Sequence, residues 1–265
     1  MGSYLAGLFE GDGHVLIAKP HLKNSRYTIC ITFHIKDLPL CEHIKSKLGH
    51  GWIRMKIKEN ACVLTFHTDD GLIAFVELVN GYLRTPKLYK YNLVLNYLNN
   101  KYGLNFFIHE PDYSNLGKNS WLAGFIDADG SFQIECPSEI KFRRCRFRIE
   151  QRMIDPFSSE SYEPIFLLIA EFFYVNLNIS THNIDKKYYC ISLDSKSSIK
   201  ILIDYLDKYK LYSSKYLDYS NWAKAGTLWI KGEARLPGNI KLIYDWKHTM
   251  NSKRKDFHWT HLSNL

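Results

Sequence analysis

Hydrophobic and polar positions along the chain switch between two periods, which predicts a mixture of helices and strands. The first apolar run, residues 4–12, predicts a helix that leads into Glu10-Gly11-Asp12-Gly13. After it, alternation with a period of two predicts four strands, and a period near 3.6 predicts three helices. The strands span 14–19, 26–36, 51–58 and 61–68, and the helices span 38–49, 71–84 and 87–98.

This order of elements occurs twice. SYLAGLFEGDGHV (3–15) returns as SWLAGFIDADGSF (120–132), each heading about half of the chain. Strands are then predicted over 131–136, 141–152, 175–184 and 186–194, and helices over 163–175, 197–209 and 215–225. The sequence therefore predicts an α+β protein with two pseudo-symmetric αββαββα domains, at 1–99 and 119–265. Turn-forming residues without a period predict a linker at 100–118.

Composition and charge narrow the class of protein. The 265 residues carry a formal charge of +8 and are 46% hydrophobic, which is typical of a globular chain with an anionic partner. The longest apolar run, 165–177, is too short to span a membrane. Six cysteines are scattered without C-x-x-C pairs, which argues against a zinc ribbon. The N-terminus has no features of a secretory or transit peptide, so we expect synthesis in the compartment where the protein acts.

The repeated stretch has small residues on one helix face. Gly7 and Gly11 are four residues apart, as are Gly124 and Ala128, and Ser3 and Ser120 are predicted to cap the two helices. Small residues allow two helix backbones to approach closely, so we expect the two helices to pack against each other.

Such packing would bring Asp12 and Asp129 together at the carboxyl ends of the two helices. A carboxylate there opposes the helix dipole by about 0.3–1 kcal/mol, and two carboxylates also repel each other. A hard divalent cation, above all Mg²⁺, would compensate both effects.

The motifs LAGLFEGDG and LAGFIDADG resemble those of the LAGLIDADG homing endonucleases, in their single-chain, two-motif form. The resemblance covers nearly the whole chain. It implies a monomer with the motif helices at the domain interface and antiparallel sheets forming a saddle on double-stranded DNA. It also implies site-specific cleavage of both strands with short 3′ overhangs, supported by Mg²⁺, with Mn²⁺ substituting and Ca²⁺ binding without cleavage. Intron-encoded, mitochondrial origin is a further implication.

The resemblance assigns roles to particular residues. It places the metal site at Asp12 and Asp129 with the adjacent Gly11 and Ala128, and catalytic lysines at the start of a helix in each half. The catalytic set that it implies is Asp12, Asp129, Lys87, Lys215 and Gln151. In the first half, Ile35 or Lys36 aligns with Gln151, so the two sites are expected to be unequal.

Strand alternation independently predicts a basic surface for DNA. Trp52, Arg54, Lys56 and Lys58 share one face, opposite a predicted core face of Ile53, Met55 and Ile57. A row of arginines on the 141–152 strand would repel itself unless an anion neutralised it. The predicted DNA-binding set is Lys19, Arg26, His34, Lys36, Trp52, Arg54, Lys56, Lys58, Gln133, Arg144, Arg146, Arg148 and Arg152.

Two other functions fit the same scaffold. One is an intron RNA maturase, acting alone or in addition to cleavage, and the other is a DNA-binding repressor with a vestigial site. Both can dispense with catalytic groups, whereas this chain retains both aspartates and both lysines. The sequence therefore favours the endonuclease.

Overall fold

A computed structural model of the chain describes residues 1–18, 26–183 and 186–265. The first half contains α1 (Gly2–Asp12), β1 (Gly13–Leu16), β2 (Thr28–His34), α2 (Leu38–Leu48), β3 (Trp52–Lys56), β4 (Ala61–Phe66), α3 (Asp69–Val79) and α4 (Leu88–Tyr102). The second half contains α5 (Trp121–Asp129), β5 (Gly130–Glu135), β6 (Arg144–Arg152), α6 (Glu163–Phe172), β7 (Asn178–Asn183), β8 (Lys186–Leu193), α7 (Lys196–Lys208) and α8 (Lys215–Lys231), followed by α9 (Pro237–His248).

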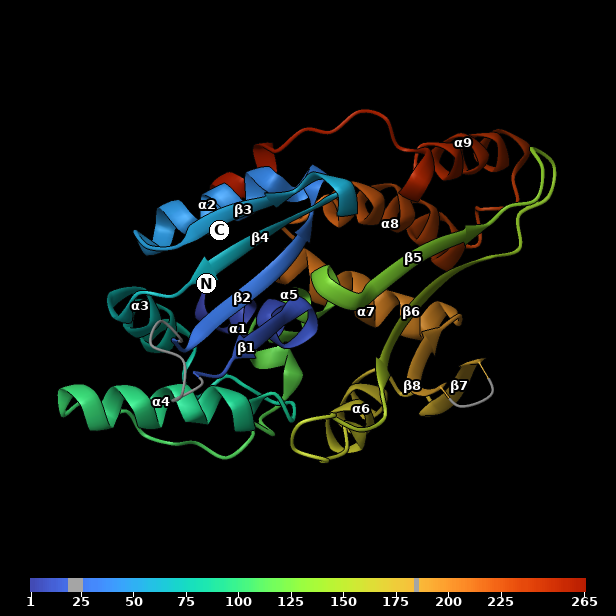
Figure 1. Ribbon diagram of the computed structural model, residues 1–265. Helices are drawn as coiled ribbons and strands as arrows, with labels where there is room; N and C mark the ends of the chain where they lie inside the picture. The colour runs from blue at the N-terminus through green and yellow to red at the C-terminus, as the bar shows by residue number, and fades with distance from the viewer. Residues whose placement is uncertain (19–25, 184–185) are drawn as a thin grey trace.

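The predicted α+β order is confirmed in both halves. Helix α9 was not predicted, because it has no counterpart in the first half from which its pattern could be recognised. Each half forms one four-stranded antiparallel sheet, in the orders β1-β2-β4-β3 and β5-β6-β8-β7 (Figure 1). Gly13 pairs with Ile31 and Gly130 with Ile149, so the two sheets have equivalent registers.

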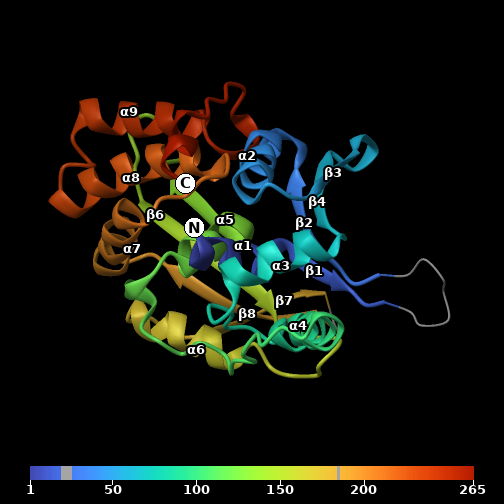
Figure 2. The ribbon, with the colours of Figure 1, turned by 90° about the vertical axis from the view of Figure 1, so that its left-hand side faces the viewer.

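Helices α1 and α5 pack against each other at the centre of the molecule, between the two halves (Figure 2). A Cβ atom placed on Gly7 would lie 1.9 Å from the carbonyl oxygen of Trp121, and one on Gly124 would lie 1.9 Å from that of Tyr4. Glycine is thus required at both positions because backbone atoms of the opposite helix fill the space. The predicted packing of the motif helices on their small residues is confirmed.

The predicted serine cap is wrong for Ser3, whereas Ser120 does stand at the N-cap of α5. Ser3 lies inside α1, and neither helix has a side-chain hydrogen bond at its N-cap. Instead, the Ser3 and Ser120 hydroxyl groups contact each other at 2.9 Å across the helix interface. Each hydroxyl therefore serves the pairing of the two halves.

Alternation correctly predicts the buried face of β1, β5 and β6. In β6, Cys145, Phe147 and Ile149 are buried, whereas the arginines between them reach solvent. The prediction fails in β3, where Met55 is 42% exposed and Ile57, in the turn that follows, is 72% exposed. β3 is an edge strand, so only Ile53 packs against the core.

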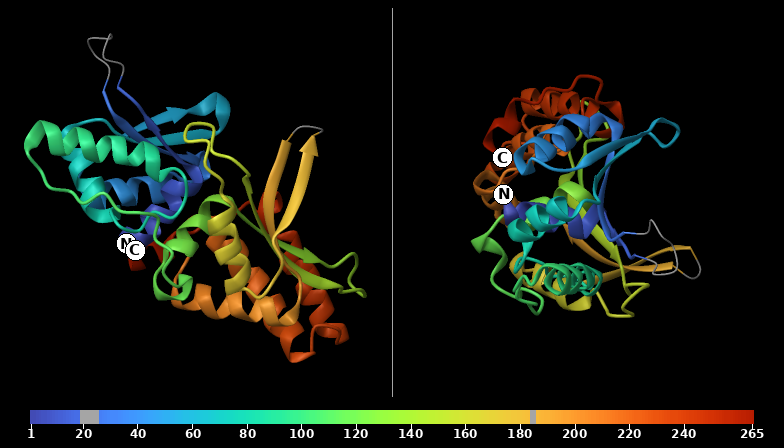
Figure 3. Two further views of the ribbon diagram at one scale, coloured as in Figure 1. Left: turned by 90° about the horizontal axis from the view of Figure 1, so that it is seen from below. Right: turned by 60° about the vertical axis from the view of Figure 1, so that its left-hand side comes forward.

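The strands of both sheets extend toward one side of the molecule, and most helices lie on the other (Figure 3, right). Seen from below, the two halves lie side by side with α1 and α5 between them (Figure 3, left). The chain crosses between halves again at its end, where the Phe257 ring meets the Lys36 ammonium group at 5.9 Å. Within the described residues, no helix has the length and apolar character needed to cross a membrane.

Candidate active site

Asp12 and Asp129 end α1 and α5, and the packing of these helices brings the two carboxylates close together. Asp12 is exposed at the mouth of the interface, yet enough protein surrounds its carboxylate to remove part of its hydration. This partial burial is the main cause that raises the pKa of Asp12 to about 6, and the negative charge of Asp129 raises it further. The positive charges of Lys215 and Lys87 lower it and oppose the shift. Burial also raises the pKa of Asp129.

Each carboxylate has a lysine beside it. Lys87, the N-cap residue of α4, donates from Nζ to the carbonyl oxygens of Gly11 at 2.6 Å and Gly13 at 2.7 Å. Lys215, the first residue of α8, donates to the carbonyl oxygen of Ala128. The two ammonium groups therefore cover the free carbonyls at the ends of the motif helices, where the helix dipole favours a cation. Burial lowers the pKa of both lysines, while the neighbouring aspartates oppose the shift.

The resemblance places the carbonyls of Gly11 and Ala128 at the metal. Both carbonyls already accept a hydrogen bond from a lysine ammonium group. A carbonyl oxygen has a second lone pair, so each could still face an ion. Their role as metal ligands stays a prediction.

Gln151 lies at the Asp129 carboxylate, to which its Nε2 donates at 3.2 Å. The expected alignment with Ile35 or Lys36 is wrong. Because Ile149 and Ile31 hold equivalent registers, the counterpart of Gln151 is Phe33, which is buried. A hydrocarbon ring cannot replace an amide, so the two carboxylates have different surroundings.

The first acid of each motif was not among the predicted site residues. Glu10 is fully buried and accepts hydrogen bonds from the backbone N–H groups of Arg84 and Thr85, from the Thr85 hydroxyl and from Trp121 Nε1. Burial raises the pKa of Glu10 to about 7, although these hydrogen bonds oppose the shift.

Asp127 has the same role in the second half. It accepts hydrogen bonds from Tyr4 at 2.7 Å, from the Tyr212 N–H at 2.6 Å and from Ser213. Glu10 and Asp127 thus anchor the turns that precede Lys87 and Lys215. The available signal was their equal spacing, two residues before the paired aspartates.

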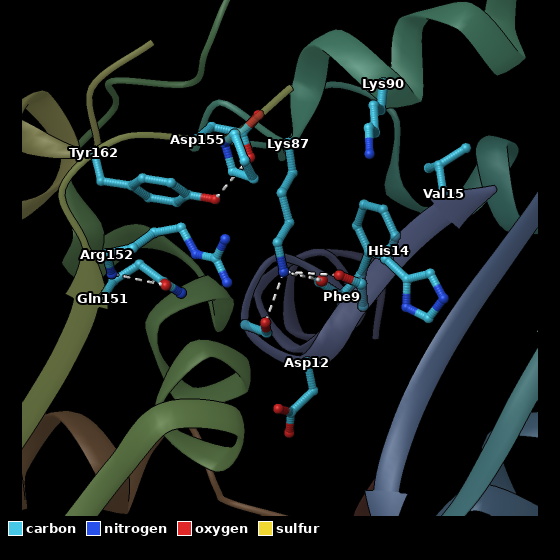
Figure 4. Close-up of a pocket in the computed structure, with 13 residues that line it drawn as sticks. Phe9, Asp12, His14, Val15, Lys87, Lys90, Gln151, Arg152, Asp155 and Tyr162 are labelled. Atoms are coloured by element: carbon cyan, nitrogen blue, oxygen red, sulfur yellow. Dashed lines mark hydrogen bonds between the residues drawn. The ribbon is translucent and has the colours of Figure 1, made fainter. Parts of the chain in front are cut away.

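A cavity of about 320 Å³ opens beside Asp12. Figure 4 shows Lys87 reaching into it between Arg152, which comes from β6, and His14, which comes from β1, with Asp12 below and Lys90 nearby. Carboxylate, ammonium and guanidinium groups thus meet in a space suited to an anion with a cation beside it.

The two lysine helices differ beyond their first residues. Three residues after Lys87, Lys90 lines the cavity. Three residues after Lys215, Asp218 is buried and paired with Arg254 at 2.8 Å. The second half therefore has a neutralised pair where the first has a cation.

Most residues of the predicted DNA-binding set reach solvent from the strand side of the molecule. Trp52 and Arg54 are exposed on β3, Gln133 on β5 and His34 at the end of β2. Lys36 and Lys58 lie in short 3₁₀ turns that follow β2 and β3, and Arg26 is exposed just before β2. Lys56 pairs with Glu59 at 2.8 Å. Lys19 lies outside the described residues.

The prediction that the arginine row needs an external anion is wrong in part. Glu135 contacts both Arg144 and Arg146 at 3.2 Å, and Glu150 pairs with Arg148. Asp194 adds a third acid, 3.0 Å from Arg144. For Arg152, no ion pair is found within residues 1–18, 26–183 and 186–265.

The donor set fits a hard divalent ion. Four oxygen donors lie at the ends of the two motif helices: the carboxylates of Asp12 and Asp129 and the carbonyls of Gly11 and Ala128. No group of three or more His, Cys, Asp or Glu residues that could hold a metal occurs in the described part of the chain. Mg²⁺ is usually bound by one or two carboxylates and takes its remaining ligands from water or phosphate oxygens.

Comparison with known proteins identifies the family. The LAGLIDADG endonuclease family matches residues 5–98 and 122–226, which places one copy of its pattern in each half. The chain belongs to the LAGLIDADG endonuclease family. The chain is 31% identical to the intron-encoded DNA endonuclease aI3 of Saccharomyces cerevisiae, and the match covers all of this chain and 72% of that protein.

Other similar proteins and a solved structure extend the comparison. A Schizosaccharomyces pombe cox1 intron-2 protein is 34% identical over 84% of this chain and 64% of its own length. An intron-encoded RNA maturase, bI4 of S. cerevisiae, is 32% identical over 53% of this chain but only 20% of its own. The crystal structure of the homing endonuclease I-GzeII with its DNA target has a TM-score of 0.72 at 20% identity, covering 96% of this chain and 99% of that one. At that identity the likeness establishes the two-domain fold.

Proposed function

We propose that this chain is a site-specific endonuclease that hydrolyses one phosphodiester on each strand of a long, non-palindromic DNA site with Mg²⁺, leaving short 3′ overhangs. The observation that carries the proposal is the meeting of Asp12 and Asp129, with a lysine bound at the end of each motif helix, where the two sheets join. One such pair per half provides one site per DNA strand. The single chain supplies both halves, so it acts as a monomer.

The chain's own residues supply binding and charge. The strand side positions the duplex through cations and polar groups. Asp12 and Asp129, with Gly11 and Ala128, would hold the divalent ion, which when bound supplies Lewis-acid stabilisation and a more acidic water. Lys87, Lys215 and Arg152 place fixed positive charge where negative charge develops on the phosphate. Gln151 orients the Asp129 carboxylate.

The proposal extends to origin and to the second activity. Two of the similar fungal proteins are named as intron-encoded or intron proteins, and one of these carries the name of a cox1 intron, which supports a mitochondrial intron as the source. Partial similarity to an intron-encoded RNA maturase keeps an RNA-splicing role as the alternative. The two acid–lysine pairs favour cleavage, because splicing support needs neither.

The test is selection of cleaved sites from a randomised double-stranded DNA library with Mg²⁺. Ca²⁺ should support binding without cleavage, and Mn²⁺ should replace Mg²⁺. Asp12→Asn and Asp129→Asn variants should keep binding and lose double-strand cleavage. Selective binding without any cleavage in Mg²⁺ or Mn²⁺ would contradict the nuclease, and binding of intron RNA would then be measured.

A further inference from the structure

The two sheets present different chemistry on the face turned away from the core. The equivalent registers of β2 and β6 align Thr28 with Arg146 and Cys30 with Arg148. Small side chains thus occupy the central strand of one sheet where long guanidinium groups occupy the other. This difference is independent of the acid–lysine pairs.

In the second sheet, Arg148 is held in place by its neighbours. Its Nε donates to Cys190 Sγ at 3.1 Å, and a terminal nitrogen pairs with Glu150. Glu150 in turn accepts hydrogen bonds from Ser180 and contacts His182 Nε2 at 3.2 Å. Arg146 is similarly held by Glu135. A guanidinium with fixed orientation loses little entropy on binding, and it still has donors to offer.

The corresponding face of the first sheet is small and weakly polar at its centre. Cys30 pairs with Thr65 and Thr32 with Val63, and both Cys30 and Val63 are only 4% exposed. The large side chains stand at the edges, where Leu16 is 52% and Trp52 is 63% exposed and Arg54 on β3 also reaches solvent. At the centre, Thr32 and Thr65 are half-buried, so their methyl and hydroxyl groups are what this part of the face offers to a base.

These faces suit different bases. Arginine donates two hydrogen bonds to the O6 and N7 atoms of guanine, whereas threonine methyls and other small apolar groups contact the methyl group of thymine. We propose that the two halves of the DNA target differ in base composition; this inference rests on the proposed DNA-binding function. The half on β5–β8 carries guanines read by Arg146 and Arg148, and the half on β1–β4 is rich in A·T pairs read through thymine methyls.

The first experiment selects bound sequences from a random duplex library in Ca²⁺, so that the readout does not depend on cleavage. Guanines should concentrate in one half of the selected site and A·T pairs in the other. Selection of a defined site with guanines spread evenly would overturn this inference and leave the proposed function intact. A protein that selects no sequence would overturn both.

The second experiment assigns the guanines to residues. Every single-base substitution of the selected site is measured for binding to the Arg148→Ala, Arg146→Ala and Lys200→Ala variants. Lys200, exposed on α7 and paired with Asp204, is the matched control. Each arginine variant should lose roughly ten- to a hundredfold discrimination for guanine at one or two adjacent positions and leave the other half unchanged. Equal weakening at all sequences would show a phosphate contact only and would overturn the inference.

Discussion

Trp121 donates from its indole Nε1 to the carboxylate of Glu10 at 2.7 Å, so the first residue of α5 is bonded to an acid near the end of α1. The same carboxylate holds Arg84 and Thr85, directly before Pro86 and Lys87. One buried side chain therefore connects the helix interface to the turn that presents Lys87. Asp127 makes the equivalent connection, from Tyr4 to the turn before Lys215.

Glu10→Gln should destabilise the protein because an amide places N–H donors against the donors of Arg84 and Thr85. We expect a loss of about 1–3 kcal/mol in the free energy of unfolding. Urea denaturation measures it, with the exposed helical residue change Glu77→Gln as the control that should have no effect. An unchanged midpoint for Glu10→Gln would show that the network contributes nothing to stability.

Gly7→Ala should also be severely destabilising, because the new Cβ would lie 1.9 Å from the Trp121 carbonyl oxygen. The helices would have to separate, which disturbs the position of Asp12 relative to Asp129. The matched control is Gly238→Ala in α9, where a Cβ meets nothing within 4 Å and where alanine favours the helix by up to about 1 kcal/mol. Thermal denaturation should show a lower melting temperature than the wild type for Gly7→Ala and not for Gly238→Ala. Equal stability of both variants would contradict the close backbone approach.

The repeat and the alternation of side chains predict most of the fold. Helix and strand periods depend only on neighbouring positions, and the repeat shows that both halves share one order of elements. The small residues at 7 and 124 predict the helix interface for the same reason. Helix α9 lacked such a signal because it has no counterpart in the first half. The exposure of Met55 and Ile57 was missed because a strand's place at a sheet edge depends on pairing that its own pattern does not reveal.

The site was predicted less completely than the fold. Asp12, Asp129, Lys87 and Lys215 come together as expected, and Gln151 reaches Asp129. The counterpart of Gln151 was misassigned because it depends on sheet register, which a one-residue shift changes completely. The acids beside the arginines were visible in the sequence, since Glu150 shares the alternation of Arg148, but which acid meets which arginine depends on folded side-chain positions.

His261 should make the protein less stable in mild acid. Its ring stacks on Tyr216, contacts the Tyr212 carbonyl oxygen at 3.1 Å and lies near His258 and Asp37; burial lowers its pKa from 6.5. The neutral ring is favoured in the folded state, so its contribution is present above about pH 6.5 and is lost as the pH falls through the lowered folded-state pKa.

The measurement for His261 is denaturation at pH 7 and pH 5. The wild type should lose more stability on acidification than His261→Phe, which keeps the stacking and cannot titrate. His109→Phe, at another histidine that also contacts an aromatic ring, is the control that should behave like the wild type. An identical acid sensitivity in His261→Phe would remove this residue as the cause.

Lys87→Met and Lys215→Met should each abolish cleavage of one DNA strand. Each ammonium group is hydrogen-bonded at the end of one motif helix, so its loss removes fixed positive charge mainly from the nearer site, although each lysine's charge reaches both carboxylates. Loss of one such electrostatic contribution typically costs about 10²–10³ in rate. Strand-specific end labels should show that the two variants nick opposite strands, while Lys200→Met cuts both.

Binding in Ca²⁺ separates this effect from damage to the fold, because both lysines also cap helix carbonyls. Both variants should bind the target as tightly as the wild type. The two residual nicking rates should differ, since Gln151 serves Asp129 while Phe33 stands at the equivalent place in the first half. Equal loss of both strands in each single variant would mean that the two carboxylates share one centre, with both lysines acting on the same phosphate.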